Sequence, residues 1–463
     1  MDTETSNLVK ARSSIVWILA ILVAFGLVWW IEKQSGRELI DKSGTGEGAA
    51  ARAMVVTGSE NGPAPAPAVV NYSPDLPPLP APRPLIELEQ AAARIAWAYF
   101  DTQADPQTGL VGSVQGYPAA TLWDMGSHLL ALVSAHDLGL LDARGLDERL
   151  ARILATWQRL PLYGGVLPNK SYDIRSLAMT DYANRPSEQG IGWSAIDLGR
   201  ALVALGVVTW RHPQHAAAVR AVLEKWDLSR SLRDAHLFGM HVEPDGKAHP
   251  VQEGRLGYEQ YAARGFALVG LRADSALSWR RNLRWVEVEG IQLPVDLRDP
   301  HRAVAQNFIV SDPFLLGALE LGWGMDGREM TWRVYRAQEE RMRRTGVPTA
   351  VTEDHVDQEP YFLYNAVFNA GQPWVTVTET GKARPELRTL SVKAAFGWHA
   401  LYGTEHTRRL VEEVAALHEP AKGFYAGRYE QDGRPNRAIT ANTNAVVLES
   451  LAFIARGPLL RFR

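Results

Sequence analysis

The chain has 463 residues, 46% of them hydrophobic, and a formal net charge of −3 at pH 7. A near-neutral chain without a polybasic face disfavours nucleic-acid binding, and its length allows one large domain or two ordinary ones. The absence of cysteine excludes disulfides, thiolate catalysis and cysteine-ligated zinc.

An apolar run, IVWILAILVAFGLVWWI, occupies residues 15–31 and follows Lys10 and Arg12. Its length is at the lower limit for a transmembrane helix, and it ends in a tryptophan pair typical of the membrane interface. A cleaved signal peptide is the alternative, but no small-x-small cleavage pattern directly follows the run. We therefore predict a cytoplasmic N-terminus (1–14), a single-pass signal anchor in an inner membrane, and a periplasmic main domain.

The next segment, residues 32–84, is rich in Gly, Ala and Pro. Such a composition cannot form a packed core and predicts an extended linker, with a proline-rich ligand for a recognition domain as the alternative. The packed domain is therefore expected to span residues 85–463.

Beyond Leu85 the hydrophobic pattern is mainly helical, and strand patterns are few, at residues 283–295 and 374–379. Helices are predicted over residues 86–100, 124–138, 146–159, 190–209, 213–226, 257–271, 312–322, 329–343, 389–402, 405–417 and 441–456.

Six of these helices share one construction: a polar or aromatic opening, then a body of Ala, Leu, Gly and Val with almost no charge. The helices between them are amphipathic, as solvent-facing helices are. This alternation predicts an all-α toroid, an (α/α)6 barrel with small β excursions. Because antiparallel outer helices join the inner ones, the N-terminal ends of the six inner helices should meet at one end, which we call the rim. A protein-interaction α-solenoid, in which these ends need not converge, is the alternative.

Aromatic and polar residues open the predicted inner helices. Indoles stack on the apolar faces of pyranose rings, and carboxylates and amides bond to hydroxyls, so carbohydrate is the expected ligand class. The rim candidates are Trp123, Asp124, Trp193, Asp197, Tyr258, Glu259, Asp312, Trp398, His399, Asn442 and Asn444.

Each candidate also has a structural interpretation. Asp124 is equally explained as a helix cap or a first-turn carboxylate. Asp197 lies three residues before Arg200, and a buried ion pair between them is an alternative to catalysis. Trp193 and Trp398, taken singly, fit a hydrophobic core.

Two loops add acidic candidates. Glu188 directly precedes an inner helix, and the segment 353–365 contains Glu359 and Tyr361 among four acids, two tyrosines and an asparagine. Such a loop is compatible with a calcium site, a solvated loop, or a catalytic base with its supports. It lacks the EF-hand pattern, and no H-E-x-x-H, G-x-S-x-G or phosphate-binding glycine motif occurs in the chain. We expect no metal and no cofactor.

Several segments together resemble the bacterial DUF3131 family, a domain without an assigned activity, over about residues 90–455. They are residues 116–141, 159–173, 190–205, 256–271 and 440–451. The chain is also similar, more distantly, to glucoamylase-like and β-1,2-glucan-processing proteins, which implies an (α/α)6 barrel that binds glucans. In those enzymes carboxylates at the barrel mouth perform the chemistry, a role that the resemblance extends to Asp124.

These observations predict a membrane-anchored periplasmic glycoside hydrolase, or a lyase-like glycan-processing protein, acting on a bacterial glucan or exopolysaccharide. The expected acid and base are Glu259 and Asp124, with Glu359, Asp197 and Glu188 as further candidates. The expected substrate contacts are Trp123, Trp193, Tyr258, Tyr361, Trp398, Asn442 and Asn444. The alternative is a non-catalytic glycan-binding or scaffold component of a polysaccharide secretion system, with polysaccharide synthesis or export proteins as partners.

Overall fold

The computed structural model of the chain describes residues 67–243, 245–300 and 305–460. The predicted signal anchor and most of the predicted linker lie outside these residues. Across the described ranges, no helix has both the length and the apolar character needed to cross a membrane. The structure therefore tests the predicted packed domain.

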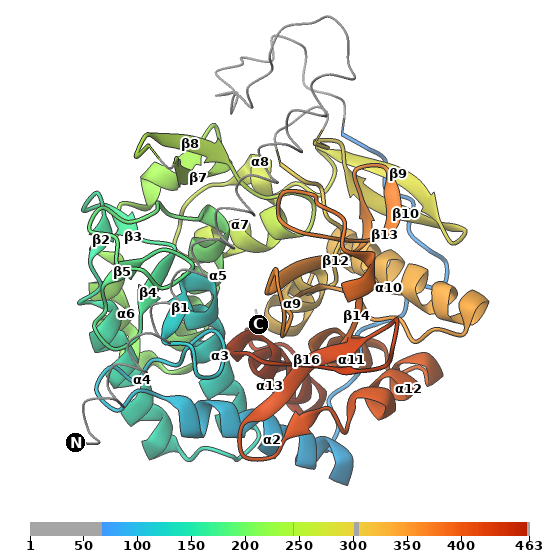
Figure 1. Cartoon of the computed structure of the whole chain (residues 1–463), viewed down its shortest axis with the longest axis horizontal. Coiled ribbons are helices and arrows are strands. Elements are labelled where there is room, and N and C mark those ends of the chain that lie inside the picture. The colour runs from blue at the N-terminus through green and yellow to red at the C-terminus, as the bar shows by residue number, and fades with distance from the viewer. Residues whose placement is uncertain (1–66, 244, 301–304, 461–463) are drawn as a thin grey trace, which may run out of the picture. The chain divides into compact units, whose positions relative to one another are not determined.

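Within the described residues, six helices form a closed inner ring in which each contacts the next and the last contacts the first (Figure 1). At its tightest crossing, a Cβ on Gly199 would meet Cα of Ala262 at 2.4 Å, so only glycine permits this approach. The inner helices are α3 (Leu122–Asp137), α5 (Ala195–Arg211), α7 (Tyr258–Leu268), α9 (Asp312–Leu321), α11 (Val392–Tyr402) and α13 (Ala441–Arg456).

Outer helices alternate with the inner ones along the described chain. Helix α12, for example, buries Leu410, Val411 and Val414 and exposes charged residues, the amphipathic pattern that the sequence predicts. The predicted (α/α)6 arrangement is confirmed for the described residues. The outer helices are α2 (Glu87–Gln103), α4 (Ala143–Trp157), α6 (Ala216–Leu223), α8 (Asp274–Leu277), α10 (Met325–Thr345) and α12 (Glu405–Val414), with 3-10 turns at Pro213–His215, Leu228–Ser231 and Pro385–Leu387.

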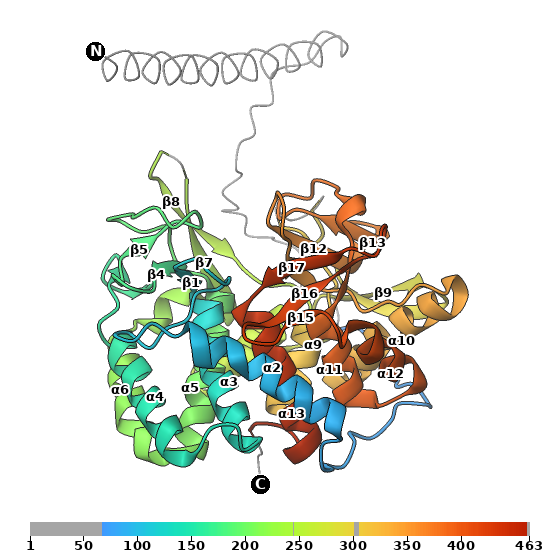
Figure 2. The same cartoon turned by 60° about the horizontal axis from the view of Figure 1, so that its bottom comes forward.

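The strands are more numerous than predicted. Several, such as Leu162–Tyr163, are too short to show a periodicity, and the eight-residue strand Phe362–Asn369 does not alternate, because its last five residues are all buried. Each described strand lies on a connection from an outer helix to the next inner helix. In Figure 2 many of them, such as β5 (Met179–Thr180), β8 (Ala248–Gln252) and β12 (Phe362–Asn369), lie above the helices. The strands therefore build up the rim.

All the described sheets are antiparallel. They comprise β1 (Ala119–Thr121), β4 (Ser171–Asp173) and β5 (Met179–Thr180); β2 (Leu162–Tyr163) and β3 (Leu167–Pro168); β6 (Leu232–Arg233), β7 (His236–Val242) and β8 (Ala248–Gln252); β9 (Leu283–Val288) and β10 (Ile291–Asp296); β11 (Glu353–His355), β12 (Phe362–Asn369) and β13 (Gln372–Val377); and β14 (Thr389–Ser391), β15 (His418–Glu419), β16 (Gly423–Tyr429) and β17 (Pro435–Ile439).

Hydroxyl caps fix where two inner helices begin. The Oγ1 atom of Thr121 accepts a hydrogen bond from the Asp124 amide at 3.2 Å, and Oγ of Ser194 accepts one from the Asp197 amide at 3.1 Å. These caps satisfy amide groups that have no partner inside the helix. Asp124 and Asp197 consequently occupy the same position in the first turn of α3 and α5.

The interior of the ring contains a charged cluster, which we call the central network: Ser127, Arg200, Tyr261, Glu320 and Glu449. The Arg200 guanidinium donates to Ser127 at 3.0 Å, to Tyr261 at 2.7 Å, to Glu449 at 3.0 Å and to Glu320. All five residues are buried. Since they come from α3, α5, α7, α9 and α13, the network ties five of the inner helices together.

The predicted linker boundary at residue 84 is wrong, because residues 67–84 pack on the barrel. Ser73 donates to Glu329 of α10 at 2.6 Å, and the Arg83 amide donates to the carbonyl of Ile454 at 2.8 Å. The proline-rich composition does give an extended backbone without a helix. Composition could not reveal that the polar groups of this segment find partners on α10 and α13.

Candidate functional site

Asp197, a half-buried residue of the rim, has a pKa raised to about 7. The main cause is burial, and the negative charges of Glu253 and Asp124 add to it, while Lys170 and Ser194 oppose it. The predicted alternative, an ion pair with Arg200, is wrong, because that guanidinium binds Glu320 and Glu449. Asp197 can therefore hold a proton near neutral pH in partial contact with solvent.

Glu253 is a half-buried carboxylate beside Asp197 that the sequence analysis did not select. Its Oε2 atom accepts the Ala195 amide at the start of α5 at 2.6 Å. On β7, a Cβ at Gly239 would lie 1.9 Å from Oε1, so this glycine leaves the space that the carboxylate occupies. Burial raises the pKa of Glu253, although Lys170 and the helix amides favour its ionised form. The sequence feature that could have identified Glu253 is its position: it lies six residues before Glu259, in the connection that precedes an inner helix.

Asp124 lies at the rim, as predicted, and is buried. Its Oδ2 atom accepts a hydrogen bond from the Thr121 hydroxyl at 2.7 Å, and the N-terminal end of α3 favours its negative charge. That charge acts on Asp197 and on His355. Asp124 is thus both a first-turn carboxylate and a neighbour of the titratable group.

A second acidic group lies on and beside β11. Lys393 Nζ lies 2.6 Å from Oδ2 of Asp312 and 3.8 Å from Oδ1 of Asp354. Burial raises the pKa of Glu353 to about 7 and that of Asp354 well above its ordinary value, although Lys393 opposes both shifts. The Tyr258 hydroxyl donates to Glu353. One lysine is therefore shared by three carboxyl groups.

The charges of these groups act on two tyrosines, Tyr182 and Tyr364. The charge of Asp197 acts on Tyr182 and on Tyr364, and the charge of Glu353 acts on Tyr364. Although Tyr182 exposes 60% of its surface, the surrounding protein and then the charges of Asp197, Glu379 and Glu253 raise its pKa. The exposed ring of Tyr182 is therefore within electrostatic range of the acids of the rim.

Glu259, one of the two expected catalytic residues, is buried in a different cluster. Its Oε2 atom lies 2.5 Å from Arg298, which also contacts Asp296 at 2.7 Å, and its Oε1 atom accepts from Gln252 at 3.2 Å. Both carboxylate oxygens of Glu259 thus have partners, and the group forms a buried ion pair with Arg298. The geometry gives no support to the expected pairing of Glu259 with Asp124.

The predicted aromatic contacts divide into two kinds. Trp123 and Tyr258 are half-buried at the rim, with ring centroids 5.7 Å apart. In contrast, Trp193 and Trp398 are 4% and 0% exposed, and their indole nitrogens donate to Phe238 and to Ser311. Their expected role as sugar platforms is wrong, because the core covers their ring faces.

The side chains of the two asparagines at the start of α13 also have different surroundings. Asn442 donates to Asp312 at 3.3 Å and so belongs to the second acidic group. Asn444 is fully buried and bonds to the backbone of Phe424, at 2.8 Å from its amide nitrogen, which is a structural role. His399 lies in the second half of α11, 3.4 Å from Glu89 of α2, and not at the rim.

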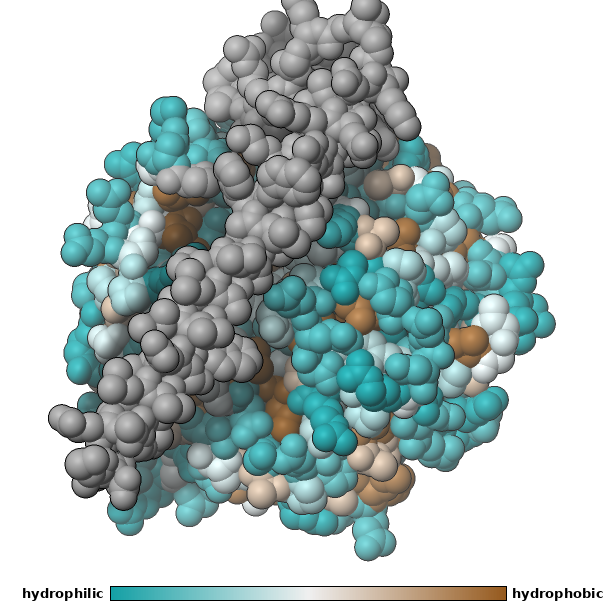
Figure 3. Space-filling model, in the orientation of Figure 1, coloured by the Kyte–Doolittle hydropathy of each residue, from teal (hydrophilic) through white to brown (hydrophobic). Residues whose placement is uncertain are grey.

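The loop candidates lie on the surface. Glu188 and Glu359 are exposed, and Tyr361 exposes 59% of its surface. Within the described ranges, no group of three or more His, Asp or Glu side chains is placed to hold a metal ion. On the face shown in Figure 3 the described residues are mostly hydrophilic, with small separate hydrophobic patches.

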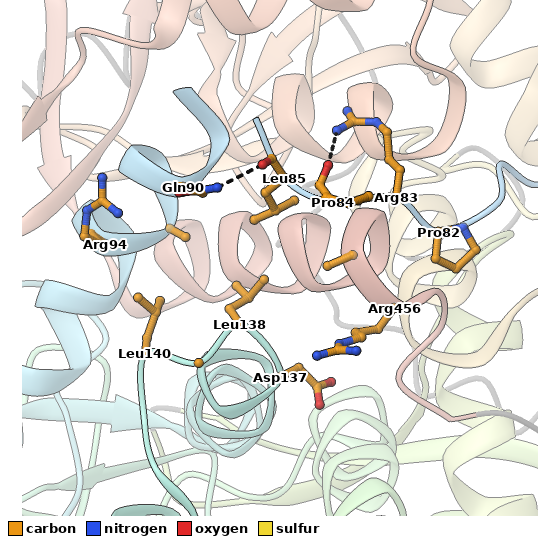
Figure 4. A pocket seen from close by; sticks show the side chains of 13 residues that line it. Pro82, Arg83, Pro84, Leu85, Gln90, Arg94, Asp137, Leu138, Leu140 and Arg456 are labelled. Atoms are coloured by element: carbon orange, nitrogen blue, oxygen red, sulfur yellow. Dashed lines mark hydrogen bonds between the residues drawn. The ribbon is translucent and has the colours of Figure 1, made fainter. Parts of the chain in front are cut away.

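A cavity of about 620 Å³ lies at the other end of the ring, beside the C-terminal ends of α3 and α13 (Figure 4). Its charged lining includes Arg94, Arg456 and Asp137, and the last is held by Arg211 at 2.6 Å. It contains none of the titratable groups described above. The candidate site is therefore the rim.

Comparison with protein-family models gives a match to the protein of unknown function family DUF3131 over residues 91–457. A comparison with curated proteins gives no match.

Several solved structures share the fold at low sequence identity. The endo-β-1,2-glucanase from Chitinophaga pinensis, in complex with sophorotriose and glucose, is 13% identical with a TM-score of 0.58, covering 80% of this chain and 93% of its own. The Talaromyces funiculosus endo-β-1,2-glucanase with sophorose is 11% identical, with a TM-score of 0.54 and coverages of 81% and 84%. A candidate glucoamylase from Bacteroides caccae is 14% identical, with a TM-score of 0.58 and coverages of 80% and 94%. The predicted fold relationship is confirmed.

Proposed function

The chain belongs to the DUF3131 family, and we propose that it is a glycoside hydrolase that cleaves a bacterial glucan or exopolysaccharide at the rim. The observation that carries the proposal is the half-buried pair of Asp197, with a pKa near 7, and Glu253. The fold shared with endo-β-1,2-glucanases supports a glycan substrate and makes β-1,2-glucan the first polymer to test.

Glycoside hydrolysis requires a protonated carboxyl group that protonates the leaving oxygen and an ionised one that activates water. Asp197 is the proposed acid, because burial and the charges of Glu253 and Asp124 keep it protonated near neutral pH. Glu253 is the proposed base, since the Ala195 amide and the charge of Lys170 favour its ionised form. The different surroundings of Asp197 and Glu253 thus favour the acid role for the first and the base role for the second.

The sugar rings would contact the aromatic side chains beside this pair. Tyr182 presents an exposed ring, and Trp123 is half-buried next to Asp124. Aromatic rings stack on the apolar faces of sugars and leave the hydroxyls to the carboxylates. These contacts would place a glycosidic oxygen near Asp197.

The test uses the full-length protein, incubated with β-1,2-glucan and with a panel of bacterial exopolysaccharides. We expect new reducing ends and shortened oligosaccharides with the wild type, and their loss with Asp197→Asn. Proton NMR of the first product gives its anomeric configuration and so separates retention from inversion. Binding of a glycan without cleavage of any polymer would contradict hydrolysis and support the scaffold alternative.

We further propose that the protein is held in an inner membrane by residues 15–31, with the barrel in the periplasm. The apolar run and its flanking basic residues support this location. A tag after residue 463 should become protease-sensitive only when the outer membrane is opened, with the protein remaining in the membrane fraction. A shortened soluble product would indicate a cleaved signal peptide instead.

A further inference from the structure

We propose that the cavity at the end of the ring opposite the rim binds an organic anion that has acid groups at both ends of an apolar body. This site is separate from the proposed catalytic site, and its ligand is a second molecule, distinct from the glycan. The inference is drawn from two arginines without partners that line the same cavity.

The walls of the cavity are bonded to one another. The Arg83 amide donates to the Ile454 carbonyl of α13 at 2.8 Å, and the Arg83 guanidinium lies 2.6 Å from the buried Glu89 of α2. The side-chain amide of Gln90 donates to the carbonyl of Leu85 at 3.0 Å. The volume of about 620 Å³ therefore lies between connected elements, and it falls in the range of about 300–1,000 Å³ that is usual for ligand pockets.

Four charged side chains line the cavity: Arg83, Arg94, Asp137 and Arg456. Two of them are paired, Arg83 with Glu89 and Asp137 with Arg211, whose two terminal nitrogens each lie 2.6 Å from one Asp137 oxygen. No described residue forms a hydrogen bond or an ion pair with the guanidinium of Arg94 or of Arg456. The lining residues therefore carry two positive charges that have no partner.

The negative charge close to the cavity is smaller. Helices α3 and α13 end there, and the C-terminal end of a helix carries roughly half a negative elementary charge. Some of their last carbonyl groups already accept amide hydrogens, that of Ser134 from Leu138 and that of Phe453 from Gly457. Glu87, an exposed acid in the first turn of α2, is not among the lining residues. About two positive charges thus face about one negative charge.

The two unpaired arginines lie at opposite ends of the cavity. Arg94 belongs to α2 and Arg456 is the last residue of α13, and Figure 4 shows Leu138 and Leu140 between them. Both leucines are half-buried, and Gly139, with a φ of +72°, turns the chain between them. An apolar surface therefore separates two cationic ends.

This arrangement selects the chemical class of the ligand. A guanidinium binds a carboxylate or a phosphate through two parallel hydrogen bonds, which are stronger than bonds between neutral groups. An alkyl body would bury the exposed surface of the leucines, which is favourable. No aromatic ring is among the described residues that line the cavity, so a sugar would have no ring on which to stack. The cavity therefore matches an apolar molecule with two acid groups better than a sugar.

The experiment uses the full-length protein and linear dicarboxylates from succinate to sebacate, each compared with the monocarboxylate of the same chain length. Isothermal titration at neutral pH and low salt should give about tenfold tighter binding of the best dicarboxylate, because the second arginine then has a charged partner. The difference should shrink as salt is raised, since added ions screen exposed charges. Arg94→Gln and Arg456→Gln should each remove the preference, whereas Arg220→Gln, an exposed site on the outer helix α6, should leave it unchanged.

Equal affinity for dicarboxylates and monocarboxylates at every chain length would overturn the inference, and so would a preference that survives in both arginine variants. Inorganic phosphate, which lacks the apolar body, should bind more weakly than the best dicarboxylate. Equally tight binding of phosphate would contradict the role of the two leucines. Because none of these measurements depends on glycan cleavage, the inference and the proposed function can fail independently.

Discussion

Carboxyl groups are buried or half-buried both in the central network and at the rim, but they have different charged partners in the two places. In the network, the guanidinium of Arg200 contacts Glu320 of α9 and Glu449 of α13. At the rim, Asp197 and Glu253 share the influence of one lysine, Lys170, and the pKa of each is raised. Burial also raises the pKa of Glu449 in the network, but that side chain has no contact with solvent, whereas Asp197 and Glu253 are only half-buried.

The two clusters differ in how the negative charge of their carboxyl groups is offset. A buried carboxylate that is bonded to arginine is fixed in position and shielded from ligands, which suits a structural role. A carboxyl group with a raised pKa and partial contact with solvent can exchange a proton, as functional groups must. Glu259 resembles the carboxylates of the network, because it is buried and bonded to an arginine, Arg298.

The largest expected effect is on the network. Arg200→Met should lower the free energy of unfolding by about 3–5 kcal/mol, because it leaves Glu320 buried without its partner. Urea denaturation followed by circular dichroism measures the change, with Arg220→Met on the exposed face of α6 as the control. A loss below about 1 kcal/mol would mean that the network is not the stabilising element assumed here.

The rim should respond mainly in activity. Asp197→Asn and Glu253→Gln should each lower turnover by about 10²-fold or more while leaving the circular dichroism spectrum unchanged. Since the proposed acid must be protonated, wild-type activity should fall as the pH rises through about 7, the raised pKa of Asp197. Wild-type turnover in both variants would remove the pair from the mechanism.

Glu259→Gln separates the two kinds of carboxylate most directly. The amide keeps the shape of the side chain but weakens the bond to Arg298, so stability should fall by about 1–3 kcal/mol. Turnover per folded molecule should stay at the wild-type level, as judged from activity normalised to the folded fraction. A large loss of turnover at unchanged stability would return Glu259 to the catalytic pair expected from the sequence.

The smallest effect concerns the pH dependence of stability. The pKa of Asp197 is raised from 3.8 to about 7, so the folded state binds its proton more tightly than the unfolded state. The resulting stabilisation is complete below 3.8 and is lost as the pH rises through 7. Asparagine does not titrate, and Asp197→Asn should therefore raise Tm by about 1–3 °C relative to the wild type at pH 8 but not at pH 4. An equal difference at both pH values would contradict the raised pKa.

The sequence predicted the barrel because long helices display their pattern locally. The charge-free bodies of α3 and α5 and the amphipathic face of α12 are readable from single segments. The convergence of the inner helices at one rim, and the places of Asp124 and Asp197 in it, follow from that alternation. The shortest strands were missed because two or three residues show no period, and the longer β12 was missed because its last five residues are all buried and do not alternate.

The assignment of roles at the rim was decided by the tertiary structure alone. No local pattern separates Glu259, which meets Arg298 from a distant segment, from Glu253, which meets the amide of Ala195. Nor does sequence distinguish the half-buried Trp123 from the fully buried Trp398. The physical reason is that burial and charge compensation depend on contacts between segments far apart in the chain, whereas helix formation depends on neighbours a few residues away.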